Sequence, residues 1–218
     1  MLIRTGRRLA TYGDGYSSAT HSPDAAGGGR IETGMSGTKR LYVLRHAKSS
    51  WDNPGLDDHE RPLSPRGQRA CAGMAEHIRT AGIAPDIVLC STARRTRETL
   101  EGVDPPGKRS IEAELYSAST QDLLDRLHRL SDDVGSAMLI GHNPSMQMLV
   151  LRLARRGDDG PERAAVERKF PTGALATLTF ECGWSELGPG SAHLTAFLTP
   201  KELGGKSGAG AAAPGHRA

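Results

Sequence analysis

Short apolar runs alternate with helix-like segments from residue 40 onward, and this alternation constrains the fold more than any other feature of the sequence. A short apolar run suits a buried strand, whereas apolar residues three and four positions apart suit one face of a helix. The predicted strands are 40–44, 86–90, 109–113, 137–140, 174–180 and 194–198. Helices are predicted to start at Ser64 and Ser119 and to span 94–100 and 144–155. The alternation predicts an α/β fold, a three-layer sandwich with a mostly parallel central sheet.

Residue types at the ends of these segments support the assignment. Ser64-Pro65 suits the N-cap and first position of a helix, and Gly82 suits its C-terminal cap. Ser119 and Asp122 have the spacing of a capping box. The last two predicted strands flank a Gly-rich turn, so we expect a hairpin-like edge there.

The two ends of the chain differ in composition from its centre. Residues 1–38 are rich in Gly, Ser, Thr and Ala without apolar periodicity, which predicts a disordered N-terminal extension. Residues 204–218 give the same prediction of a disordered tail, and 39–203 form the predicted domain. Met35 lies just before the first strand, so both Met1 and Met35 are candidate translation starts.

Charge and composition exclude several classes of protein. The formal charge is +3, aromatic residues make up 4% of the chain, and like charges do not cluster, so we expect no nucleic-acid partner. No apolar stretch is long enough for a membrane span. Cys71, Cys90 and Cys182 are odd in number and lack metal-ligand spacing, which favours a reducing cytoplasm. We expect a cytoplasmic monomer.

Unusual polar residues follow three of the predicted strands. Arg45 and His46 end the first strand, Arg95 follows the second, and His142 and Asn143 follow the fourth. Ligands of open α/β sheets gather beyond the carboxyl ends of the strands, so these side chains should converge. Arginine forks and helix N-termini both bind phosphate oxygens. The sequence therefore predicts a phosphate site at this edge.

These residues fall within three motifs. The first is Arg45-His46-Ala47-Lys48-Ser49-Ser50-Trp51-Asp52, the second contains Ser91, Arg95 and Thr99, and the third is Gly141-His142. In this order they resemble the histidine phosphatase superfamily in its phosphoglycerate-mutase-like branch. Ala47 and Asp52 depart from the mutase pattern of Gly and Asn. Together with Arg61-Pro62-Leu63, they resemble the SixA-type phosphohistidine phosphatases, and the resemblance covers about residues 40 to 203.

The resemblance implies roles for the motif residues. His46 would be the nucleophile, and Arg45, Arg95 and His142 would hold the phosphoryl oxygens. Ser49 would add a further oxygen contact. Family members need no metal or other cofactor, and the sequence shows no metal-ligand spacing.

Three further residues are candidates from their positions. Lys48 and Asn143 stand beside motif histidines and are candidate substrate contacts, although a surface lysine is an equally open reading of Lys48. Glu114 follows the third predicted strand and is the candidate general acid, because an alkoxide leaving group needs a proton. An ordinary exposed glutamate is an equally open reading. A phosphoramidate such as phosphohistidine leaves more easily.

The spacing of the motifs bears on the substrate. Only 47 positions separate Arg95 from His142, which leaves no room for the lid that mutase-like relatives insert there. An open pocket would admit a phosphorylated side chain of a protein. The sequence thus predicts a phosphohistidine or phosphomonoester phosphatase, with two alternatives: a phosphatase of small metabolites with the same site, or a non-catalytic module that binds phosphorylated ligands.

Overall fold

The computed structural model describes residues 37–155, 157 and 160–206, all within one compact unit, Met35–Ala218. The predicted N-terminal extension up to residue 36, the alternative start at Met35 and the tail from residue 207 lie outside the described residues. Within the described part, no helix is both long and apolar enough to cross a membrane.

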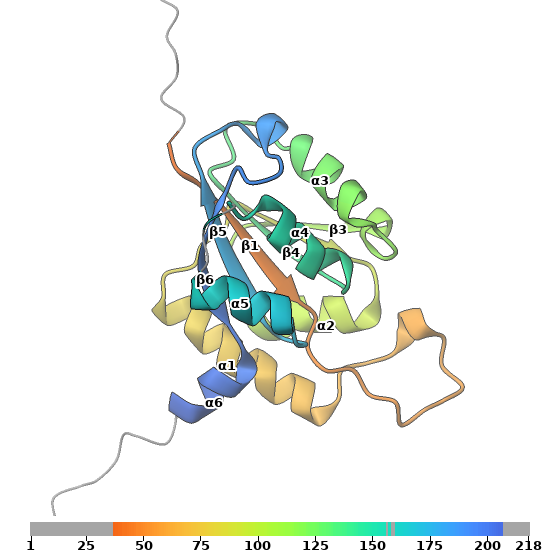
Figure 1. Ribbon diagram of the computed structural model, residues 1–218. Helices are drawn as coiled ribbons and strands as arrows, with labels where there is room; N and C mark the ends of the chain where they lie inside the picture. The colour runs from red at the N-terminus through yellow and green to blue at the C-terminus, as the bar shows by residue number, and fades with distance from the viewer. Residues whose placement is uncertain (1–36, 156, 158–159, 207–218) are drawn as a thin grey trace, which may run out of the picture. The chain divides into compact units, whose positions relative to one another are not determined.

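A sheet forms the centre of the described residues (Figure 1). It has six strands, in the order β3-β2-β4-β1-β5-β6. Its strands are β1 (Lys39–Arg45), β2 (Ile87–Ser91), β3 (Lys108–Glu112), β4 (Ser136–Gly141), β5 (Leu175–Phe180) and β6 (His193–Leu198). Strands β1 to β4 run parallel, whereas β5 is antiparallel to both β1 and β6. The mostly parallel sheet and its antiparallel edge are therefore confirmed.

Helices cover both faces of this sheet (Figure 1). The helices are α1 (Pro65–Thr80), α2 (Arg94–Val103), α3 (Thr120–His128), α4 (Ser145–Leu153), α5 (Pro161–Arg168) and α6 (Pro200–Lys206). Short 3-10 helices are η1 (Asp58–Glu60), η2 (Ala113–Leu115) and η3 (Trp184–Glu186). The strands alternate between two cores: Leu41 and Val43 pack with α3, α4 and α5, while Tyr42 and Leu44 pack with α1 and α2. This arrangement confirms the three-layer sandwich.

The predicted helix caps are present. The Ser64 side chain accepts a hydrogen bond from the Gly67 amide at 3.2 Å, and Gly82 ends α1 with a φ of +63°. Ser119 and Asp122 form the reciprocal capping box, with hydrogen bonds of 3.2 and 2.8 Å.

Two helices were not predicted from the sequence. Helix α5 buries only Val166, so it lacks the apolar stripe by which a helix is recognised in a sequence. Helix α6 runs from Pro200 to Lys206, so residues 204–206 are helical, whereas the sequence places the start of a disordered tail at 204. Its two glycines account for that expectation, because Gly disfavours helices.

The strand order brings together the three strand ends that carry the motifs. Strand β4 lies between β1 and β2 and is parallel to both. In the register of the sheet, Arg45 lies opposite Gly141, and Cys90 lies opposite Ile140. The residues that follow these three strands therefore lie at the same edge of the sheet, next to one another.

Candidate active site

His46 lies at the centre of the site, immediately after β1. Its backbone amide donates to the Gly141 carbonyl at 3.0 Å, and its side chain is buried. The ring atom Nδ1 lies 2.7 Å from the Ala47 carbonyl oxygen. A carbonyl oxygen can only accept, so Nδ1 carries the proton and the lone pair of Nε2 is free. His46 is thus arranged to attack through Nε2.

The surroundings of His46 keep its ring neutral. Burial lowers the pKa of His46 to about 3, and the hydrogen bond to the Ala47 carbonyl only partly offsets this. His142 and the positive charges of Arg95 and Arg45 lower the pKa of His46 further. At neutral pH the ring therefore remains unprotonated on Nε2, as a nucleophile requires.

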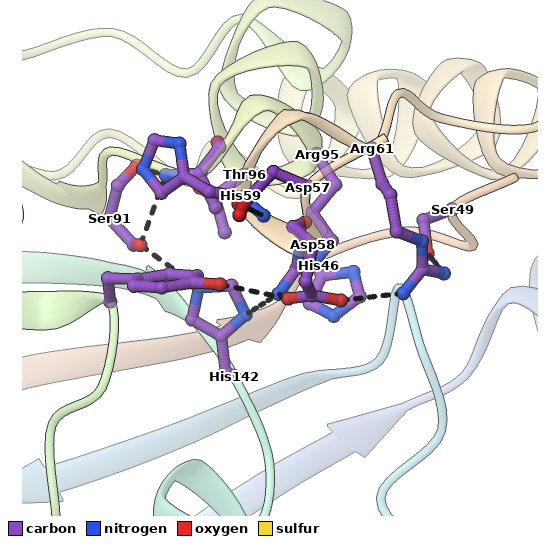
Figure 2. A network of polar contacts seen from close by, with 12 residues as sticks. His46, Ser49, Asp57, Asp58, His59, Arg61, Ser91, Arg95, Thr96 and His142 are labelled. Atoms are coloured by element: carbon purple, nitrogen blue, oxygen red, sulfur yellow. Dashed lines mark hydrogen bonds and ion pairs between the residues drawn. The ribbon is translucent and has the colours of Figure 1, made fainter. Parts of the chain in front are cut away.

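His142, at the end of β4, faces His46 with 5.2 Å between the ring centroids (Figure 2). Its Nδ1 lies 3.3 Å from Nη2 of Arg95, and its Nε2 lies 2.9 Å from Oγ of Ser91. Since an arginine can only donate, Nδ1 of His142 is the acceptor and Nε2 carries the proton. Burial and then the charge of Arg95 lower the pKa of His142 to about 4, against the opposing effect of Asp58.

Arg95 lies in the first turn of α2, and its guanidinium is buried in the site. It donates to the backbone oxygen of Asp58 at 2.5 Å and to Oδ2 of Asp58 at 3.0 Å. The Thr99 hydroxyl donates to the Arg95 carbonyl at 2.6 Å and accepts from the Ala47 amide at 3.0 Å. Thr99 thus joins the backbone of Arg95 to the turn that follows His46.

Arg45 and Asn143 converge on one backbone oxygen. The Phe170 carbonyl accepts from Nη1 of Arg45 at 2.7 Å and from Nδ2 of Asn143 at 3.2 Å. Within the described residues, Nε of Arg45 and Oδ1 of Asn143 are buried without a hydrogen-bond partner. Burial also lowers the pKa of Arg45. Each of the two side chains therefore keeps one buried polar atom without a partner among the described residues.

Ser49 and Lys48 take different positions. Ser49 is buried, and its hydroxyl accepts from Nη2 of Arg61 at 2.8 Å. Lys48 is exposed, and its backbone oxygen accepts from the amide and the hydroxyl of Ser64 at 2.8 and 3.0 Å. Through its backbone, Lys48 thus anchors the N-terminus of α1.

Glu114, the candidate general acid, is bound to helix α3. Its carboxylate pairs with Arg129 and lies 3.7 Å from Nε of Arg126. The side chain is half-exposed on η2. These contacts join Glu114 to helix α3 rather than to His46 or His142, so the structure gives no support to its assignment as general acid.

The carboxylate that does lie in the site is Asp58, which the sequence did not single out (Figure 2). Its Oδ1 accepts from Nη1 of Arg61 at 2.7 Å, and its Oδ2 accepts from Arg95 and from the Tyr116 hydroxyl at 3.0 and 2.9 Å. The partners Arg95 and Tyr116 lie 37 and 58 positions away. Only the spacing to Arg61 could have been recognised locally, and it predicts no more than a surface ion pair.

The hydrogen bonds of Asp58 hold it in the ionised form. Burial alone would raise the pKa of Asp58, but the hydrogen bonds from Tyr116 and Arg61 and the charge of Arg95 lower it overall. Asp58 is therefore a carboxylate at neutral pH.

Aromatic side chains border the site. The Tyr116 ring packs edge-on against His142 and against His59, with centroid distances of 5.6 and 4.8 Å. Trp51 is 68% exposed and lies under the guanidinium of Arg61, 3.2 Å from its ring centroid. A planar group could thus stack or pack at the mouth of the site.

Positive charge in the site comes from three arginines: Arg45, Arg61 and Arg95. Across the described residues there is no group of three or more His, Cys, Asp or Glu side chains that could hold a metal ion. The arrangement can bind the oxygens of a phosphoryl group next to a neutral imidazole.

Comparison with known proteins agrees with this geometry. Residues 41–115 match the model of the histidine phosphatase superfamily (branch 1). The uncharacterised protein Rv1276c of Mycobacterium tuberculosis is 36% identical over 161 residues, which cover 72% of this chain and all of that protein.

Two solved structures share the fold. SixA from Nakamurella multipartitia is 27% identical, with a TM-score of 0.68 over 75% of this chain and 97% of its own. SixA from Agrobacterium tumefaciens is 30% identical, with a TM-score of 0.62 over 74% of this chain and 98% of its own. With its phosphoglycerate-mutase-like fold and paired histidines, the chain belongs to the histidine phosphatase superfamily and is of the SixA type.

Proposed function

We propose that the protein is a phosphohistidine phosphatase that works through a phosphorylated His46. The observation that carries the proposal is the fixed tautomer of His46: Nδ1 donates to the Ala47 carbonyl, so Nε2 is a free nucleophile. It lies beside His142 and within the field of Arg45 and Arg95. These are the groups that an in-line transfer of a phosphoryl group requires.

The reaction has two balanced steps. In the first, Nε2 of His46 forms a bond to phosphorus while the bond from phosphorus to the leaving group breaks, and its electron pair goes to the leaving atom. In the second, a water oxygen attacks phosphorus, the bond to Nε2 breaks, and phosphate and the free imidazole result. Arg45 and Arg95 stabilise the charge on the equatorial oxygens in both steps. The Ala47 carbonyl accepts from Nδ1–H and so stabilises the positive ring of the intermediate.

Neither Asp58 nor Glu114 is available as a protonated carboxylic acid, which supports phosphohistidine as the substrate. Asp58 is held ionised, and Glu114 is bound to helix α3. An alkoxide leaving group needs a proton in the transition state, whereas imidazole leaves a phosphoramidate without one when its other nitrogen is already protonated. The site therefore favours phosphohistidine over alkyl phosphates.

A comparison of substrates in EDTA tests this proposal. Phosphohistidine on a carrier protein should be hydrolysed with a higher kcat/KM than sugar phosphates or nucleotides, and EDTA should leave the activity intact because arginines supply the positive charge. His46→Asn should abolish turnover of every substrate, whereas His128→Asn, which changes a histidine bound to the Leu187 carbonyl, should not. Efficient turnover of a sugar phosphate with none of phosphohistidine would establish the small-metabolite alternative instead. Loss of activity in EDTA that a divalent ion restores would exclude the metal-independent mechanism.

A further inference from the structure

Asp58 occupies an unusual position for a carboxylate in a site that binds anions (Figure 2). Its partners Arg95 and Arg61 have side chains that are only 8% and 9% exposed, whereas the side chain of Asp58 is 54% exposed. His46 is likewise buried, at 8%. The nucleophile thus lies at the floor of the site, and Asp58 lies on its solvent side.

In-line transfer relates these two positions to the leaving group. The leaving atom must lie opposite Nε2 of His46 across the phosphorus atom, which places it on the solvent side. Asp58 reaches that side while it remains bound to Arg95, an arginine of the phosphoryl site. The leaving group therefore departs near a fixed negative charge.

The lone pairs of Asp58 leave room for another donor. A carboxylate has about four acceptor positions, and the structure shows three side-chain hydrogen bonds to Asp58, from Arg61, Arg95 and Tyr116. Tyr116 and His59 stand in edge-to-face contact beside it, so a flat ring that approaches Asp58 meets an aromatic wall.

We propose that Asp58 determines the specificity of the site for the leaving group, because its carboxylate accepts the N–H of a phosphorylated imidazole and disfavours leaving groups that depart as anions. This inference rests on the proposed function and adds to it the residue that selects the substrate.

The chemistry balances without a proton transfer. In the phosphorylated imidazole, one nitrogen carries phosphorus and the other carries a proton, so the ring is positive. Nε2 of His46 bonds to phosphorus, the P–N bond breaks, and its electron pair returns to the ring nitrogen, which gives neutral imidazole with its N–H intact. An adjacent carboxylate stabilises the positive ring and favours its protonated form. A phenolate or alkoxide would instead develop negative charge beside Asp58.

Asp58→Asn tests the inference, because asparagine has nearly the same shape and keeps one acceptor oxygen but has no charge. We expect kcat/KM for a phosphohistidine protein to fall at least tenfold and kcat/KM for para-nitrophenyl phosphate to rise. Asp57→Asn is the matched control: it removes a neighbouring carboxylate that accepts only from the His59 amide, at 2.8 Å, among its described contacts. If the asparagine variant does not fold, Asp58→Ser removes the same charge. It should likewise lower kcat/KM for the phosphohistidine protein and raise kcat/KM for para-nitrophenyl phosphate.

The outcomes separate this inference from the proposed function. Equal losses of kcat/KM on both substrates would show that Asp58 only positions Arg95. A change below threefold in the ratio of the two kcat/KM values would show that Asp58 does not select the leaving group. Either result overturns the inference. A wild-type protein that hydrolyses para-nitrophenyl phosphate but not phosphohistidine would instead refute the proposed function itself.

Discussion

The two histidines of the site have similar environments and opposite hydrogen-bond partners. Nδ1 of His46 faces a carbonyl that can only accept, whereas Nδ1 of His142 faces an arginine that can only donate. The free lone pair therefore lies on Nε2 in His46, while Nε2 of His142 is protonated and donates to Ser91. This difference in tautomer supports the proposal that His46, rather than His142, is the nucleophile.

Burial of both rings should make the stability of the protein fall in mild acid. Their pKa values in the folded protein are about 3 and about 4, below the ordinary 6.5. Between pH 6.5 and 4 the unfolded chain therefore binds more protons than the folded one, so stability falls as the pH falls. At pH 5 each ring should lower the free energy of unfolding by about 2 kcal/mol relative to its value at pH 7. Thermal unfolding at a series of pH values measures this.

The control is the variant His46→Asn/His142→Asn, which lacks both titrating groups. Its melting temperature should fall less between pH 7 and pH 5 than that of the wild type, whatever its stability at pH 7. Parallel curves for the two proteins would contradict the assigned pKa values.

At the scale of single residues, part of the candidate site could be predicted from the sequence. Arg45, His46, Arg95 and His142 could be recognised because each ends or follows a buried strand, and the topology of a parallel sheet determines where strand ends meet. Asp58 could not be recognised, because its partner Tyr116 lies 58 positions away. Glu114 illustrates the same limit, since its order in the chain did not reveal its pairing with Arg129, the residue that follows α3.

Helix α1 supports the turn that carries the first motif. The amide and hydroxyl of Ser64 both donate to the Lys48 carbonyl, next to Gly67 in the first turn of the helix. A Cβ atom on Gly67 would lie 2.2 Å from that carbonyl oxygen. Backbone thus meets backbone here, and only glycine permits the approach.

Gly67→Ala should therefore destabilise the protein and impair the site. Either the helix or the turn after His46 must shift, which should cost about 1–3 kcal/mol and lower kcat/KM. Gly73→Ala is the matched control in the same helix, because its added Cβ would lie 3.8 Å from the nearest atom, on Leu203. That variant should be as stable as the wild type or more so. Equal unfolding free energies for the two variants would contradict the role of Gly67.

The elements themselves were largely predictable, for reasons that differ along the chain. Strands β1, β2 and β4 are buried on both faces and appear in the sequence as continuous apolar runs. Helix α1 carries an N-cap, an N-terminal proline and an apolar stripe. Helix α5 has none of these beyond its proline and is fixed by tertiary packing of Val166. Local signals thus predict elements that carry their own caps and patterns.

At the scale of the whole molecule, the topology of the sheet determines where the site forms. The β2-β4-β1 order brings three motif-bearing strand ends together. Between Arg95 and His142 the chain holds the rest of α2, then β3, η2, α3 and β4, and every residue of this interval is described. The expectation that this interval carries no inserted lid is met. The mouth of the site is bordered instead by Tyr116, His59 and the half-exposed Asp58.

The central claim is that phosphate passes through Nε2 of His46. Wild-type protein mixed with radiolabelled phosphohistidine substrate and quenched in alkali within one turnover should carry label that is stable in base, labile in acid, and located on His46 by peptide mapping. His142→Asn should slow turnover and still carry its label on His46. Label on His142, or single-turnover release of phosphate with no labelled protein at any quench time, would contradict the account.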